Sequence, residues 1–149
     1  MSEHRASVEW SREGRDFVYE TYSRRHRLRF EGGITVQGNA APANIPRTVP
    51  PAPGVDPEQA FVAALSSCHM LWFLHLACQR KFVVDRYVDE AVGTLAGNWI
   101  AKVTLRPVVT FSGKAPSDEE HRALHHKAHE KCYIANSVKS EVLVEPRIA

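Results

Sequence analysis

The sequence has few of the features that mark a secreted or a nucleic-acid-binding protein. Its three cysteines in 149 residues are an odd number and do not suggest a structural disulfide framework, so any disulfide should be transient and functional. The 19 basic and 17 acidic residues leave a net charge of only +2, and we expect no nucleic-acid partner. The first residues, MSEHRASVEW, lack the apolar core of a signal peptide, so we expect a cytoplasmic protein.

An uninterrupted apolar run long enough for a clear membrane span is also lacking. Residues 61–78 (FVAALSSCHMLWFLHLAC) are strongly apolar, but two serines and two histidines interrupt the run, which favours a buried helix over a membrane segment. The composition, 44% hydrophobic and 24% charged, is that of a globular protein. A chain of this length suits a single domain, residues 1–149.

The order of the predicted elements indicates an α+β fold with a mainly antiparallel sheet. Asp56 suits the N-cap of a helix that opens with Pro57, and Ser117 with Glu120 matches a capping box. The predicted elements are strands at 6–10, 17–30 and 34–37, a connector with five prolines at 39–54, a helix at 57–80, strands at 83–97 and 102–111 with Pro107 at a bulge or edge, a helix at 117–131, and a strand at 142–144.

The first predicted helix is apolar nearly all round, so it must be covered on several sides. One small domain with few other helices can hardly supply that cover. A second copy of the chain is therefore expected to pack against it.

Cys68 and Cys132 are the candidate reactive residues, although buried cysteine is also a common core residue. A nucleophilic thiol must be ionised, and Cys68 lies about 15 Å along the helix from Glu58, beyond the reach of the helix dipole. An arginine from the stretch YSRRHRLRF is the natural partner, although such a run is more often a solvated strand face. We interpret Cys78 as a packing residue, because it lies too far round and along the helix to bridge Cys68.

The second helix offers a rival constellation for a metal. His125, His129 and Cys132 are spaced so that a continuous helix brings them to one face, and imidazole with thiolate can hold zinc or another soft metal. A fourth ligand would have to come from a distant segment, such as His69 or Cys68.

Two segments resemble the OsmC/Ohr family of osmotically inducible and organic hydroperoxide resistance proteins. The segment DPEQAFVAALSSCHM is similar to the family's Pro-Glu pair, small-residue helix and first cysteine, at Cys68, with the spacing from Glu58 also matching. The segment AHEKCYIANSVKSEVLVEP resembles the context of the second cysteine, at Cys132. The resemblance covers most of the chain from Trp10 onward, and it implies the OsmC-like fold as an intertwined homodimer with two long central helices at its middle.

The resemblance also implies a thiol-dependent peroxidase for defence against oxidative stress, with no cofactor and no bound metal. Cys68 would attack an organic hydroperoxide and Cys132 would close a disulfide, which an external thiol of the lipoyl-dithiol kind would reduce. Glu58 matches the family glutamate, which holds an arginine beside the thiolate. We assign that arginine to Arg24, with Arg25 as the alternative.

Two departures from the family pattern and one geometric question stay open at this point. His69 and Tyr133 follow the two cysteines where many members carry proline, and His69 is interpreted as a packed or interface residue. Glu58 reaches Cys68 only through a bridging arginine, a bend in the helix or the other subunit. The alternative functions are a non-catalytic binding protein of the same fold for a small apolar ligand, and the metal module described above.

Overall fold

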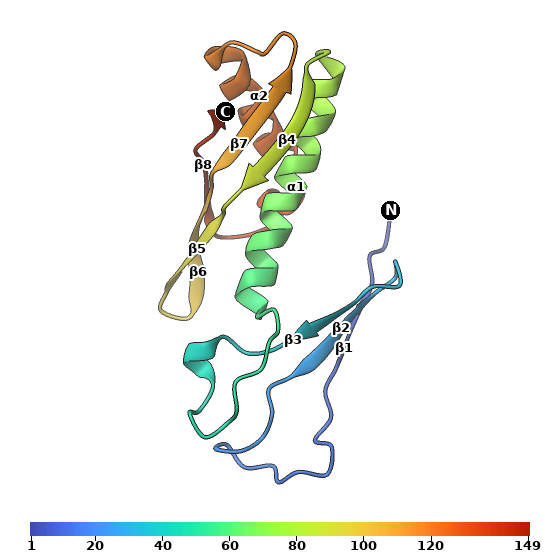
Figure 1. Ribbon diagram of the computed structural model, residues 1–149, viewed down its shortest axis with the longest axis vertical. Coiled ribbons are helices and arrows are strands. Elements are labelled where there is room, and N and C mark those ends of the chain that lie inside the picture. Colours follow the sequence, from blue (N-terminus) through green and yellow to red (C-terminus); the bar gives the residue numbers. More distant parts are fainter. The chain divides into compact units, whose positions relative to one another are not determined.

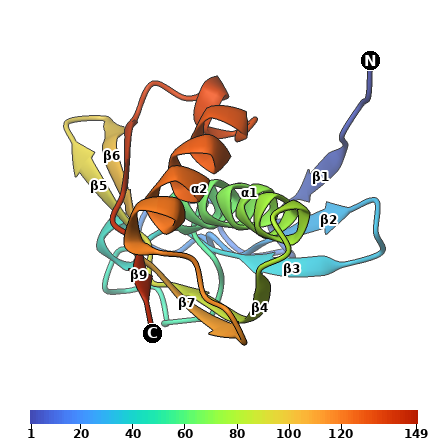
Figure 2. The ribbon, with the colours of Figure 1, turned by 90° about the horizontal axis from the view of Figure 1, so that it is seen from above.

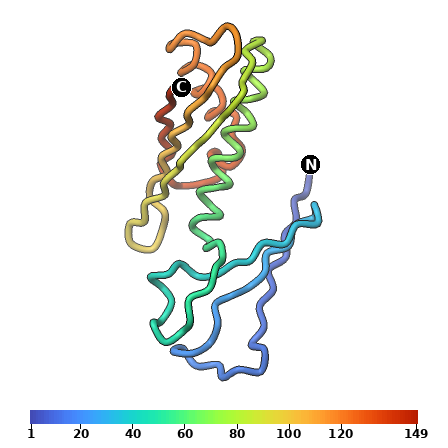
Figure 3. The backbone as a smooth tube through the Cα atoms, in the orientation of Figure 1, coloured from blue at the N-terminus to red at the C-terminus, as the bar shows by residue number.

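A computed structural model describes all residues, 1–149, and the chain divides into two compact units, Met1–Ala60 and Phe61–Ala149 (Figure 1, Figure 3). The α+β fold class is confirmed, and four of the six strand pairings are antiparallel. Each unit is described by itself below.

The first unit contains one antiparallel sheet of β1 (Ala6–Glu9), β2 (His26–Phe30) and β3 (Thr35–Gly38), in that order. The prediction of a strand over 17–30 is wrong in its first half. The N–H groups of Thr21 and Tyr22 both donate to the Val18 carbonyl, which closes a turn where a strand would need partners on a neighbouring strand. The proline-rich connector carries one short 3-10 helix, η1 (Pro42–Asn44).

The second unit holds two three-stranded sheets. The first contains β4 (Val83–Asp89), β7 (Pro107–Ser112) and β9 (Arg147–Ile148), in the order β4-β7-β9. The second contains β5 (Val92–Ala96), β6 (Trp99–Leu105) and β8 (Glu141–Val144), in the order β5-β6-β8. Both β8 and β9 run parallel to their neighbours.

The two long strands predicted at 83–97 and 102–111 are each broken into two, and the halves belong to different sheets. The breaks lie together, because the Arg106 N–H donates to the Asp89 carboxylate at 2.6 Å. The same carboxylate accepts a hydrogen bond from Ser66 on the first helix. Pro107 begins β7 and does not form a bulge within a strand, since a strand's first residue can lack a ladder N–H.

Two helices pack against these sheets, α1 (Pro57–Gln79) and α2 (Asp118–Lys131), and Figure 2 shows both on the same side of β4 and β7. The predicted caps are confirmed. The Gln59 N–H donates to the Asp56 carboxylate at 2.7 Å, and Ser117 and Glu120 form a reciprocal capping box. α2 ends at Cys132, its C-cap residue, and the short 3-10 helix η2 (Ala135–Ser137) follows.

Helix α1 is buried on one face only within the single chain, so the cover expected on its other sides is not supplied by this chain. Its buried residues recur every four positions, at Leu65, His69, Phe73 and Ala77, and Phe73 packs with Val109 of β7 in the core. On the opposite face, Leu71 is 63% exposed. By length and composition alone α1 would also be able to cross a membrane.

Candidate functional site

The fold brings Cys68 and Cys132 next to one another as free thiols, although 64 residues separate them in the chain. Cys68 projects from the middle of α1 and is partly exposed, whereas Cys132 is buried at the end of α2. The backbone around Cys132 is fixed by local hydrogen bonds. Its N–H donates to the His129 carbonyl at 3.2 Å, and its sulfur accepts the Ala135 N–H at 3.4 Å.

The surroundings of Cys132 oppose its ionisation. The pKa of the Cys132 thiol is raised to about 11, mainly by burial and with a further contribution from the neighbouring Cys68 thiol, while the Ala135 N–H acts in the opposite direction. Cys132 is therefore held as a neutral thiol at physiological pH. As a neutral thiol, Cys132 is a poor first nucleophile, so Cys68 would have to react first.

Cys68 lines an apolar pocket of about 500 Å³ within the second unit. Trp72, one turn along α1 from Cys68, is at the centre of its wall. The rings of His75 and Tyr133 both meet Trp72 edge-on at 5.7 Å, and the Lys131 ammonium lies 5.3 Å from the same ring. The remaining lining residues are Ala64, Ser67, Leu71 and Ile134. The pocket can hold an apolar molecule against the Cys68 sulfur.

Three buried histidines, one on α1 and two on α2, form a chain of close contacts. The Nε2 atom of His69 lies 2.9 Å from Nδ1 of His125, and Nε2 of His125 lies 3.2 Å from Nε2 of His121. The His125 ring also stacks on Phe73 at a centroid distance of 4.1 Å. Because one nitrogen of a neutral imidazole donates and the other accepts, both contacts can be hydrogen bonds when all three rings are neutral, whereas Nδ1 of His69 is buried without a partner.

Burial is the main reason why these histidines stay neutral. It lowers the pKa of His69 to about 4, with a smaller contribution from His129. It lowers the pKa of His125 to about 2, with contributions from His69 and His121. Burial also lowers the pKa of His121. The sequence contains the i, i+4 spacing of His121 and His125, but their meeting with His69 depends on how the two helices pack.

The metal module built on His125, His129 and Cys132 is not supported. No group of three histidine, cysteine, aspartate or glutamate side chains in the structure is arranged to hold a metal ion. The physical reason lies in His125, whose two ring nitrogens face His69 and His121. Zinc needs such nitrogens free and converging on one point.

Arg24 and Glu58 line one pocket, which belongs to the first unit. No ion pair within 4.0 Å joins them. The Arg24 guanidinium instead donates to the carbonyls of Tyr22 at 2.6 Å and Tyr19 at 2.7 Å, and it lies 3.7 Å from the Tyr22 ring centroid. Arg25 does not line this pocket. Of the two candidate arginines, only Arg24 therefore shares a cavity with Glu58.

Cys78 is exposed on α1, so the interpretation as a packing residue is wrong within the single chain. Cys78 lies in the last turns of the helix. Ala77 belongs to the buried face there, and Cys78, the next residue, points away from that face.

Comparisons with known proteins match the chain to OsmC-like proteins. The family model for OsmC-like proteins matches residues 50–147. An OsmC-like protein of unknown function from Vibrio cholerae is 45% identical, with a TM-score of 0.90 and coverage of 98% of this chain and 99% of that one. A comparison with curated protein sequences finds no significant match.

Two more distant structures are similar in fold. One is an organic hydroperoxide resistance protein OsmC from Legionella pneumophila, at 18% identity and a TM-score of 0.64, covering 100% of this chain and 98% of that one. The other is the organic hydroperoxide resistance protein OhrB of Bacillus subtilis, at 17% identity and a TM-score of 0.60, covering 99% and 98%.

Proposed function

Because the chain belongs to the OsmC-like family, we propose that it is a thiol-dependent peroxidase that reduces organic hydroperoxides in defence against oxidative stress. The observation that carries the proposal is the pair of neighbouring free thiols, Cys68 and Cys132, of which Cys68 lines an apolar pocket. The pocket suits an organic hydroperoxide better than hydrogen peroxide, since its walls offer apolar and aromatic contacts to a carbon substituent.

The proposed reaction has three steps. The Cys68 thiolate attacks the outer peroxide oxygen, an S–O bond forms, the O–O bond breaks, and the alkoxide takes up a proton to leave as an alcohol. Cys132 then attacks the sulfur of the Cys68 sulfenic acid, an S–S bond forms, the S–O bond breaks, and the hydroxide leaves with the Cys132 proton as water. An external dithiol reduces the disulfide by exchange and is itself oxidised.

We propose Arg24 as the cation that stabilises the Cys68 thiolate and Glu58 as the carboxylate that positions Arg24. Their support is the pocket that they share. The Arg24 guanidinium, held by two carbonyls and a tyrosine ring, is already oriented and loses little further side-chain freedom when it acts.

We also propose that the functional form is an intertwined homodimer in the cytoplasm, with no membrane or nucleic-acid partner. The exposed apolar face of α1, with Leu71 at its centre, supports a second copy as the missing cover. The free state of all three cysteines suits a reducing compartment.

The test is stopped-flow consumption of cumene hydroperoxide and of hydrogen peroxide by the dithiol-reduced protein. Turnover should be faster with cumene hydroperoxide and should disappear in Cys68→Ser. Cys132→Ser should stop after one equivalent and retain a sulfenic acid that a dimedone probe traps. Cys78→Ser is the matched control, because it removes an exposed thiol of the same helix, and it should behave like the wild type.

Peptide mapping of the oxidised wild type should show a Cys68–Cys132 disulfide. Failure of the wild type to consume either peroxide would refute the peroxidase and leave the pocket as a binding site for a small apolar ligand.

A further inference from the structure

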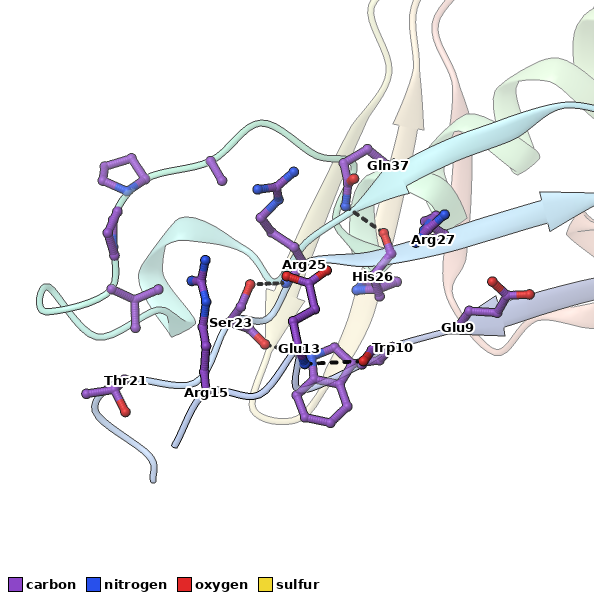
Figure 4. Close-up of a pocket in the computed structure, with 15 residues that line it drawn as sticks. Glu9, Trp10, Glu13, Arg15, Thr21, Ser23, Arg25, His26, Arg27 and Gln37 are labelled. Carbon is purple, nitrogen blue, oxygen red and sulfur yellow. Dashed lines mark hydrogen bonds between the residues drawn. The ribbon is translucent and has the colours of Figure 1, made fainter. Parts of the chain in front are cut away.

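A second pocket, of about 460 Å³, lies within the first unit and is unlike the one beside Cys68. Its lining is rich in cations and hydrogen-bond donors, including Arg15, Arg25, Arg27, Ser23 and Gln37. Figure 4 shows Arg15 and Arg25 reaching from two separate segments of the chain toward the same space, with Ser23 between them. The proline-rich stretch 49–52 forms another part of the wall.

The three arginines of this pocket have no partner in the protein. None of the guanidinium groups of Arg15, Arg25 and Arg27 forms an ion pair within 4.0 Å or donates a side-chain hydrogen bond. The neighbouring arginines of the same unit differ, because Arg24 donates to two carbonyls and Arg29 pairs with Glu9 at 3.4 Å. Arg47 of the same unit is unpaired too, so three of the unit's four unpaired guanidinium groups line the pocket.

The charge balance of the lining favours an anion. Two carboxylates, Glu9 and Glu13, also border the pocket. Glu9 is already paired with Arg29, which lies outside it, so three guanidinium groups face the single unpaired carboxylate of Glu13. Three guanidinium groups around one cavity repel one another, and a bound anion would remove that repulsion. The Ser23 hydroxyl oxygen accepts the Arg25 N–H at 3.2 Å, which leaves its own proton free to donate inward.

We propose that this pocket binds a small phosphate monoester through Arg15, Arg25 and Arg27. The planar fork of arginine matches two phosphate oxygens at once, and three such forks suit the dianionic headgroup of a monoester. The pocket is open to solvent and its arginines are exposed, but its volume suits a small molecule, and the small net charge of the whole chain argues against a nucleic-acid strand. The ring of Trp10, which also lines the pocket, provides a flat apolar surface for the rest of the ligand.

Isothermal titration with phenyl phosphate, inorganic phosphate and phenol, at constant ionic strength, tests the proposal. Phenyl phosphate should bind with saturation, inorganic phosphate more weakly, and phenol not at all. Arg25→Gln and Arg15→Gln should each weaken phenyl phosphate binding about tenfold or more, the loss expected for one charge-assisted contact. Arg47→Gln removes an exposed arginine of the same unit that lines neither pocket and should leave the affinity unchanged.

Thermal melts of all variants establish that they are folded, and Trp10→Phe assigns any fluorescence change to the pocket. Lack of saturable binding to the wild type at about 10 mM phenyl phosphate would overturn the proposal. Equal weakening by Arg47→Gln and Arg25→Gln would overturn it too, because the attraction would then come from general surface charge. These measurements involve no peroxide, so their outcome is independent of the proposed peroxidase activity.

Discussion

Acidification should destabilise the protein through its buried histidines, and the size of the effect follows from their pKa values. In the folded chain, burial lowers the pKa of His69 from 6.5 to about 4 and that of His125 from 6.5 to about 2. The unfolded chain binds these protons at the ordinary pKa. Between pH 6.5 and 4 the unfolded state therefore holds more protons, and stability falls as the pH falls.

The magnitude can be worked out for one histidine. A group with a pKa of 6.5 unfolded and about 4 folded, like His69, lowers the free energy of unfolding by about 2.5 kcal/mol between pH 7.5 and pH 4.5. His125 contributes a loss in the same direction over the same range. Because the two rings share a hydrogen bond, the contributions are not simply additive.

Urea unfolding at several pH values, at one fixed protein concentration, measures this loss. His69→Gln keeps a donor for His125 but does not titrate in this range, so its loss should be smaller than that of the wild type by about 2.5 kcal/mol. His126→Gln removes an exposed imidazole of α2 and should follow the wild type. An identical pH dependence in the wild type and His69→Gln would refute the reasoning.

Two further predictions concern the core and the second thiol. Phe73→Ala removes a fully buried ring that stacks on His125, and it should lower the free energy of unfolding by about 3–5 kcal/mol in urea unfolding. A decrease of less than about 1 kcal/mol would mean that the ring is not packed as described. Because burial raises the pKa of Cys132 to about 11, disulfide formation after Cys68 is oxidised should accelerate with pH between 7 and 10. Quenched mass spectrometry follows the rate of disulfide formation. A rate independent of pH would contradict that pKa.

The sequence predicted those features of the fold that depend on neighbouring residues. Both helix starts are encoded within four residues, Asp56 to Gln59 and Ser117 to Glu120, and the structure forms both caps. The division of the strands was not predictable in the same way. The residues of 83–97 favour strand on both sides of the break, and the break depends on a hydrogen bond between Asp89 and Arg106, which are 17 positions apart.

In the candidate site, too, the sequence predicts local features but not tertiary contacts. The two cysteines stand out by motif, but their contact depends on the packing of α2 against α1, which no local pattern specifies. His125, His129 and Cys132 have the spacing of a metal site, and only the tertiary structure shows that the ring nitrogens of His125 face His69 and His121 instead. The unpaired state of Arg15, Arg25 and Arg27 is likewise a tertiary property, because a basic strand with every charge solvated would have a similar sequence.

The order of the two thiols in the proposed reaction follows from access as well as from acidity. Cys68 lines the pocket, whereas Cys132 is 1% exposed and does not line it, so a hydroperoxide in the pocket meets Cys68 first. Once Cys68 is a neutral sulfenic acid, its contribution to the raised pKa of Cys132 changes, while burial, the largest cause, stays. Cys132 is therefore mostly protonated before it attacks, and the small thiolate fraction of Cys132 carries the step, while the hydroxide that leaves Cys68 takes up a proton and departs as water.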